Sequence, residues 1–336
     1  MKKKMYLLIL FLGILFCISF RESASANTIP IGIAVEFMDH AASAYICQDK
    51  GWFEEEGLDI KSYESYITGM SLASALARGD IQVAYICLVP AINVYANAKV
   101  PIQIVAGTHK HGYGLVVDID KVKTIQDLER KDVRIGCVRE GGAVDVLFHK
   151  TMDECGLDKG KVLNNIQRMN PVKQILAIQM GKLDAAFLPE QWATLAVNFG
   201  FKRLLMSQDI WPEMQGSVIV VKKEFIRMHP ELVKKIVMLS DRATNWINQN
   251  KMEAAEIVTF QLQRTEKNLS PKQLPDAIDK IEMSSDVMLR SMERLDYSSC
   301  IDPVIIQETI DYLSQLGYIN KKFDAEEILD LRFLKE

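Results

Sequence analysis

The stretch from Ser65 to Ile92 constrains the fold more than any other, because two strand-to-helix junctions flank one short helix in it. The pattern predicts a strand end at Tyr63–Ile67, a turn at Thr68–Gly69 and a helix over Met70–Arg78. The glycine that follows this helix tolerates the left-handed conformation common just after a helix. A helix of this length between two strands is typical of a βαβ unit.

The second half of the same stretch repeats this arrangement. Ile81–Ile86 is an apolar run that predicts a buried strand, and Pro90 is suited to the first turn of a further helix. Strands and helices that alternate so closely predict a parallel sheet covered on both faces. The sequence therefore predicts an α/β fold, in which helix N-termini and the ends of strands share one edge.

The pattern begins again after Val133. Ile31–Glu36 is matched by Ile135–Glu140, and Arg78–Tyr85 by Met180–Phe187, in the same order along the chain. These matches predict two similar α/β units, although unrelated βαβ sequences also resemble one another. A chain of 336 residues is long enough for two such units.

Further elements follow from local signals. We predict a helix over His40–Lys50 with Asp39 as its N-cap, and a polar loop over Thr108–Gly114. A strand at Ser217–Val221 is predicted to return the chain to the first unit. Everything beyond it is predicted to be helical and to cover the first unit. These helices begin at Pro230, at Pro271 and at Pro303.

The N-terminus has the features of an export signal. Three lysines precede the apolar run Met5–Phe20, and Ala24–Ala26 is a small-residue cleavage pattern. We predict cleavage after residue 26, with an uncleaved anchor helix as the alternative. The bulky Phe16 before Cys17 argues against a lipid anchor.

Composition excludes several classes. The formal net charge of -4 becomes more negative once residues 1–26 are removed, since that segment holds more basic than acidic residues. An acidic chain without a basic stripe is a poor nucleic-acid binder. The five cysteines beyond the signal lack metal-site or disulfide-framework spacing, so we expect mostly buried thiols and no metal or cofactor. They are Cys47, Cys87, Cys137, Cys155 and Cys300.

No catalytic motif is found, since GxSxG, HExxH and GxxxxGK[ST] are all absent. Arg139–Gly142 is either a tight turn or a place where bare N–H groups and Arg139 bind an anion. Thr68–Gly69, preceded by Tyr66, occupies the corresponding turn of the first unit. Glu190 either binds a ligand amine or caps a helix.

Other polar and aromatic residues carry open alternatives. The sequence His109–His111 is interpreted as a solvated surface loop and not as a set of metal ligands. Tyr113 and Trp211 either stack on a ligand ring or pack in the core.

The segments HAASAYICQDKGWFEEEGLDI, TGMSLASALARGDIQVAYICLVPAI, VRIGCVREGGAVDVL and GKLDAAFLPEQWA resemble solute-binding proteins of ABC importers. The group is the nitrate, sulfonate and taurine family, which includes binders of pyrimidine-type thiamine precursors. The resemblance covers Ile29–Leu334. It implies a two-lobed type II periplasmic-binding fold with a ligand cleft between the lobes and crossovers near Gly114–Val117 and Gln215–Val221. Lobe 1 is expected at 27–114 and 219–336, and lobe 2 at 115–218.

The resemblance also implies positions in the cleft. These are Phe37, His40, Thr68, Gly69, Cys87, Leu88, Arg139, Gly141, Gly142 and Glu190. This chain has Gln191 where many members have proline after the glutamate, and Cys87–Leu88 where small residues are common. Ligand identity therefore does not transfer.

The function implied is that of a monomeric, extracytoplasmic solute-binding protein, which closes on a small organic anion or zwitterion and delivers it to a permease with its ATPase. Glu36, Asp39, Glu140 and Glu190 near the expected cleft favour a zwitterion or neutral heterocycle over an inorganic anion. A pyrimidine-type ligand, a ligand-sensing subunit and an enzyme on the same fold are the alternatives. The export signal and the missing Cys-rich motif of pyrimidine synthases argue against an enzyme.

Overall fold

The described part of the computed structural model comprises residues 29–79, 81–266 and 283–334. The described residues from Ile31 onward belong to one compact unit. The predicted signal sequence and the helix predicted from Pro271 lie outside the described residues. Within the described part, no helix has both the length and the apolar character needed to cross a bilayer.

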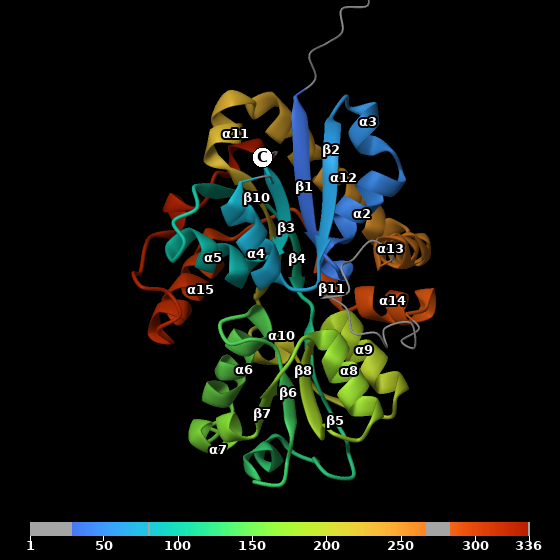
Figure 1. Ribbon diagram of the computed structural model, residues 1–336, viewed down its shortest axis with the longest axis vertical. Helices are drawn as coiled ribbons and strands as arrows, with labels where there is room; N and C mark the ends of the chain where they lie inside the picture. Colours follow the sequence, from blue (N-terminus) through green and yellow to red (C-terminus); the bar gives the residue numbers. More distant parts are fainter. Residues whose placement is uncertain (1–28, 80, 267–282, 335–336) are drawn as a thin grey trace, which may run out of the picture. The chain divides into compact units, whose positions relative to one another are not determined.

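A six-stranded sheet combines early and late parts of the described chain (Figure 1). Its strand order is β11-β4-β10-β3-β1-β2. β1 and β3 pair in parallel, and β10 lies antiparallel between β3 and β4. The strands are β1 (Pro30–Glu36), β2 (Asp59–Tyr66), β3 (Val83–Cys87), β4 (Ile102–His111), β10 (Gln215–Lys222) and β11 (Leu295–Tyr297).

A five-stranded sheet takes up the middle of the chain, in the order β7-β6-β8-β5-β9. β6 pairs in parallel with β7 and β8, and β5 lies antiparallel between β8 and β9. The strands are β5 (Tyr113–Val117), β6 (Ile135–Cys137), β7 (Ile166–Arg168), β8 (Ala185–Pro189) and β9 (Lys202–Met206).

The two sheets share one topology. The order β2-β1-β3-β10-β4 in the first corresponds to β7-β6-β8-β5-β9 in the second. In each of these orders the fourth strand is antiparallel to its neighbours, and the strand that precedes it along the chain belongs to the other sheet. β5 is the next strand after β4, and β10 is the next strand after β9. The sequence matches fall at equivalent places, since Ile31–Glu36 contributes to β1 and Ile135–Glu140 to β6. The predicted pair of similar α/β units is confirmed.

Successive apolar side chains of a strand point to opposite faces of the sheet, which explains why helices cover both faces of each sheet. Ile33 and Val35 of β1 pack in one hydrophobic cluster, whereas Ala34 packs in the other. In the six-stranded sheet, α2, α12 and α13 cover the first face, and α4, α5 and α15 cover the second (Figure 1). In the five-stranded sheet, α8 and α9 cover one face, and α6 and α7 the other.

The helix bounds follow. The helices are α2 (Ala42–Asp49), α3 (Trp52–Glu55), α4 (Gly69–Arg78), α5 (Leu88–Ala96), α6 (Ala143–Glu154), α7 (Lys159–Asn164), α8 (Pro171–Gln179), α9 (Glu190–Asn198), α10 (Ser207–Ile210), α11 (Lys223–Met228), α12 (Pro230–Gln249), α13 (Lys251–Glu266), α14 (Ser285–Met292) and α15 (Pro303–Gln315). Short 3-10 turns are η1 (Asp39–Ala41), η2 (Ile125–Glu129), η4 (Ala325–Glu327) and η5 (Leu331–Phe333).

Three local predictions are wrong. The loop predicted over Thr108–Gly114 is instead the end of β4 and the start of β5. The region after β10 is not wholly helical, because β11 pairs with the end of β4. Asp39 does not cap a helix with its side chain, since it lies inside η1 and its Oδ2 accepts a hydrogen bond from the Ser291 hydroxyl at 2.5 Å.

The chain passes between the sheets at two places. The first is Gly112, between β4 and β5, where His111 and Gly112 have φ values of 64° and 92°. The second follows β9, where α10 and a short turn lead to β10. The first crossing therefore lies slightly earlier than predicted, because the whole of β5 belongs to the five-stranded sheet.

Candidate functional site

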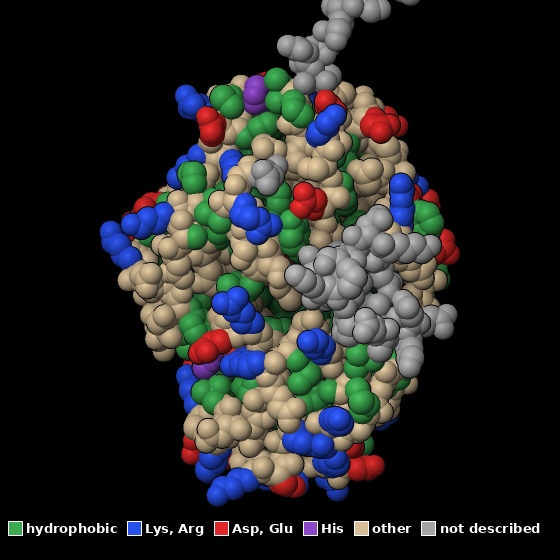
Figure 2. Space-filling view, in the orientation of Figure 1, with side chains coloured by type: hydrophobic (Ala, Val, Ile, Leu, Met, Phe, Trp, Pro, Cys, Tyr) green, Lys and Arg blue, Asp and Glu red, His purple; other side chains and the backbone are tan. Residues whose placement is uncertain are grey.

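A pocket of about 60 Å³ lies where residues from both sheets meet. Its wall is mostly apolar and includes a few polar side chains, as is common for small-molecule sites. In Figure 2 a hollow in the middle of the visible face contains hydrophobic side chains and has basic ones near its rim. The lining residues are Glu36, Met38, Ile67, Thr68, Gly69, Met70, Cys87, Pro90, Tyr113, Val138, Arg139, Gly142, Ala143, Val144, Pro171 and Pro189.

The topology explains this position. β1 ends at Glu36 and β3 at Cys87, and these parallel strands end at the same edge of their sheet. α4 begins at Gly69 and α6 at Ala143, so the first turns of two helices also reach the pocket. Unpaired N–H groups in such turns give the pocket a positive electrostatic character.

Five predicted site residues line the pocket. These are Thr68, Gly69, Cys87, Arg139 and Gly142. The Arg139 side chain is exposed and forms no ion pair or hydrogen bond with another described residue. An unpaired guanidinium at the wall of a pocket is well suited to an anionic group.

The N–H groups of the two glycines in the Arg139–Gly142 turn are not available to a ligand. The Gly141 N–H donates to Asp145 Oδ2 at 3.0 Å, and the Gly142 N–H donates to the Arg139 carbonyl at 3.1 Å. The next two N–H groups, of Ala143 and Val144, have no hydrogen-bond partner among the described residues. The donors that face the pocket are thus at the start of α6 and not in the glycine turn.

The other predicted residues lie elsewhere. Phe37, His40 and Leu88 are buried next to the pocket without lining it, and the Tyr66 hydroxyl donates to Glu64 at 2.5 Å. Gly141 lines a separate groove between α4, α5 and the start of α6.

Glu190 is also absent from the pocket wall. Its carboxylate is buried and accepts hydrogen bonds from both terminal nitrogens of Arg203, at 2.6 and 3.0 Å, and from Thr194 at 2.8 Å. Burial raises the pKa of Glu190, against the lowering effect of Arg203. Because its oxygens are occupied, this placement does not support the predicted amine contact.

Glu36 is the acidic side chain of the pocket wall, and sequence reasoning had placed it only near the cleft. Its Oε2 accepts a hydrogen bond from the Cys87 thiol at 2.8 Å, whereas the buried Oε1 has no partner among the described residues. Burial raises the Glu36 pKa to about 7. The feature of the sequence that could have identified Glu36 as a pocket residue is its position at the end of the predicted first strand.

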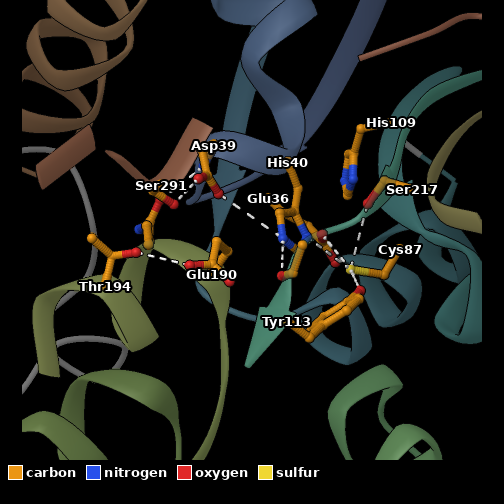
Figure 3. A network of polar contacts seen from close by, with 12 residues as sticks. Glu36, Asp39, His40, Cys87, His109, Tyr113, Glu190, Thr194, Ser217 and Ser291 are labelled. Atoms are coloured by element: carbon orange, nitrogen blue, oxygen red, sulfur yellow. Dashed lines mark hydrogen bonds and ion pairs between the residues drawn. The ribbon is translucent and has the colours of Figure 1, made fainter. Parts of the chain in front are cut away.

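Four side chains meet at the Cys87 sulfur (Figure 3). Besides Glu36, His40 Nδ1 lies 3.6 Å away, the Tyr113 hydroxyl donates at 3.1 Å and the Ser217 hydroxyl at 3.6 Å. Burial lowers the pKa of His40 to about 4 and raises that of the Cys87 thiol. Glu36, His40 and Cys87 together offer metal-ligand atoms within 4.8 Å of one another.

The remaining candidates are structural, with the exception of Tyr113. His109 and His111 are buried in β4, and Lys110 pairs with Glu213 at 2.6 Å, so the surface-loop interpretation is wrong. Trp211 packs at right angles against Tyr312, which agrees with the core alternative. Tyr113 lines the pocket through its position in β5.

The fold and its interlobe pocket define a protein of the periplasmic-binding class. The alkanesulfonate-binding protein of Xanthomonas axonopodis pv. citri, solved with MOPS bound, superposes with a TM-score of 0.73 at 13% identity, covering 91% of this chain and 100% of that one. At such identity the likeness establishes the fold, and the predicted type II fold is confirmed.

Sequence comparison gives the family. The model of the NMT1-like family matches residues 25–261, and this chain belongs to that family. The taurine-binding periplasmic protein of Escherichia coli K12 is 26% identical over 209 residues, which cover 61% of this chain and 62% of that protein. The putative aliphatic sulfonates-binding protein of Bacillus subtilis 168 is 21% identical over 303 residues, covering 87% and 83%. Both relatives are binding proteins, in agreement with the predicted class.

Proposed function

We propose that this chain is an extracytoplasmic solute-binding protein of an ABC importer, which captures a small organic anion or zwitterion. It then presents the solute to a membrane permease and its ATPase. Membership of the NMT1-like family and the taurine- and sulfonate-binding relatives support the class of solute. A monomer exported by a signal peptide at residues 1–26 is part of this proposal.

One observation carries the choice of solute. The same pocket presents the Arg139 guanidinium and the carboxylate oxygen Glu36 Oε1, and neither has a hydrogen-bond or ion-pair partner among the described residues. The acidic end of a zwitterion would contact Arg139 and the N–H groups of Ala143 and Val144, and its amine would face Glu36. Glu36 takes the place of Glu190 as the proposed partner of the amine, because the Glu190 carboxylate already accepts hydrogen bonds from Arg203.

Binding is proposed to proceed by hinge closure between lobe 1 (27–114 and 219–336) and lobe 2 (115–218). Two chain crossings between the sheets permit such motion. A solute that touches residues of both sheets stabilises the closed state by its differential affinity for that state.

Calorimetry with taurine, a short alkanesulfonate, nitrate and an aminopyrimidine tests this proposal. We expect taurine to bind most tightly, with weaker binding of the alkanesulfonate and of nitrate, because neither offers Glu36 an amine and Glu36 repels a bare anion. Preference for the aminopyrimidine would favour the thiamine-precursor alternative. Turnover of a bound probe would indicate an enzyme, and a pull-down of a signalling receptor without a permease would indicate a sensing subunit.

A further inference from the structure

Two side chains of the pocket wall, Glu36 and Cys87, and one directly behind it, His40, form a group that the solute-binding role alone does not require. Glu36, His40 and Cys87 are all buried, and each places one ligand atom within 4.8 Å of the other two (Figure 3). They come from the end of β1, from η1 and from the end of β3. Thiolate, imidazole and carboxylate are the three donor types that zinc uses in proteins.

We propose that Cys87 Sγ, His40 Nδ1 and Glu36 Oε2 bind a divalent transition-metal ion of the zinc class. This site departs from the sequence expectation, because the three residues are too far apart in the chain to form a recognisable metal motif. The proposal goes beyond the proposed solute-binding function, and either can fail without the other.

The distances suit such an ion. Bonds of about 2.3 Å to sulfur and about 2.0 Å to nitrogen, at a tetrahedral angle, separate the two ligand atoms by about 3.6 Å. The Cys87 Sγ to His40 Nδ1 distance is 3.6 Å. Glu36 Oε2, now 2.8 Å from the sulfur, would have to move outward by several tenths of an ångström. A small rotation of the Glu36 side chain supplies this movement.

Surrounding contacts orient the ligands. His40 Nε2 lies 2.8 Å from the Gly112 carbonyl, which accepts its proton and leaves the Nδ1 lone pair directed at Cys87. A Cβ at Gly112 would lie 2.7 Å from His40 Nε2, so only glycine permits this approach. The Tyr113 hydroxyl donates to the Cys87 sulfur and would stabilise a thiolate there.

Three protein ligands leave at least one coordination position open. Glu36 and Cys87 line the pocket, so this position faces the space assigned to the solute. Catalytic zinc sites share this arrangement of three protein ligands and one exchangeable position. Glu36 Oε1 remains free to accept a hydrogen bond from a solute.

Cobalt titration of the purified protein tests the site. The protein is first treated with a chelator and a thiol reductant, and both are removed before the titration. It should then bind one Co²⁺ and develop a near-ultraviolet sulfur-to-cobalt charge-transfer band. Cys87→Ser should abolish the band, and Glu36→Gln should weaken Co²⁺ binding at least tenfold. The matched control is Cys155→Ser with Cys300→Ser, which removes the two more accessible thiols and should keep the band.

Absence of a sulfur-to-cobalt band in the unmodified protein would overturn the proposal, whether or not any variant folds. Persistence of the band in Cys87→Ser, or its loss in the double control variant, would also overturn it. Circular dichroism of each variant identifies misfolding. Calorimetry with taurine in the presence of chelator separates the two proposals, since it measures solute binding without the ion.

Discussion

Gln191 Oε1 accepts a hydrogen bond from the backbone N–H of Asp39 at 2.8 Å. The Gln191 amide nitrogen also donates to the Phe37 carbonyl at 3.4 Å. Gln191 belongs to α9, after β8 of the five-stranded sheet, whereas Asp39 follows β1 of the six-stranded sheet. One buried amide therefore joins the two sheets beside the pocket. It lies at the position where the resemblance described above implies a proline in many family members.

We call the arrangement in which Gln191 joins the two sheets closed, and replacement of Gln191 by alanine should weaken it. The loss of two hydrogen bonds costs about 1–2 kcal/mol, which corresponds to about a tenfold change in the equilibrium between closed and open states. Small-angle scattering should show a larger radius of gyration without solute, and calorimetry should show weaker binding. Gln208→Ala is the control, because its hydrogen bonds stay within residues 206–208. Equal radii for both variants would contradict this role.

Arg139→Ala should weaken solute binding at least tenfold while leaving stability nearly unchanged. The side chain is exposed, and its removal breaks no hydrogen bond or ion pair with a described residue. Calorimetry with the best-binding probe and urea unfolding measure the two effects. Arg227→Ala, an exposed arginine remote from the pocket wall, should change neither. Unchanged affinity in Arg139→Ala would remove Arg139 from the site.

Glu190→Ala should destabilise the protein by about 3 kcal/mol, because it leaves the largely buried Arg203 without its partner. Urea unfolding measures this loss. Since Glu190 is not in the pocket wall, solute affinity of the folded variant should change less than threefold. Glu224→Ala, at a loose surface ion pair, should cost less than about 1 kcal/mol. A large loss of affinity in Glu190→Ala would restore the amine contact predicted from the sequence.

Gly69→Ala should block the pocket. A Cβ there would lie 2.2 Å from Glu36 Oε1 and 2.7 Å from Pro90 Cγ, so Glu36 or the start of α4 must shift. We expect more than tenfold weaker solute binding, together with a lower midpoint of thermal unfolding. Gly160→Ala in α7 is the control, since the added methyl meets only Asp158 Oδ1 at 3.3 Å. Equal affinities would show that Gly69 does not border the bound solute.

Acid should destabilise the protein partly through Asp184. Burial favours a raised pKa, but hydrogen bonds from Arg134 and Lys121 outweigh it and hold the Asp184 pKa well below its usual range. The resulting stability is present above the unfolded-state pKa of about 4 and is lost as the pH falls toward the folded-state value. Urea unfolding from pH 6 to pH 3 should show a shallower decline in Asp184→Asn. An equal decline would contradict this role.

Sequence reasoning predicted the fold well where periodicity was local. The strand predicted at Ile81–Ile86 and found at Val83–Cys87, the helix ended by Gly79 and the paired α/β units all follow from apolar spacing and turn residues. It failed over Thr108–His111, because polar residues there indicated a loop. In the structure they form a strand paired with β10 and β11, and both partners come from far along the chain.

The site was predicted only in part for a related reason. Thr68, Gly69 and Arg139 occupy turns after strands, where position in a βαβ unit determines proximity to the pocket. Glu190 occupies such a position too, yet a long-range partner, Arg203, occupies its carboxylate. The meeting of Glu36, His40 and Cys87 depends on tertiary packing that no spacing in the sequence reveals.

The antiparallel strands β10 and β5 have a consequence for biogenesis. Without β10, the first repeat would leave a gap between β3 and β4, and without β5 the second would leave one between β8 and β9. Neither half is a self-sufficient folding module, because the backbone groups beside each gap would lack hydrogen-bond partners. A nascent chain synthesised only as far as residue 112 would therefore expose unpaired strand edges, which promote aggregation until the rest of the chain is synthesised.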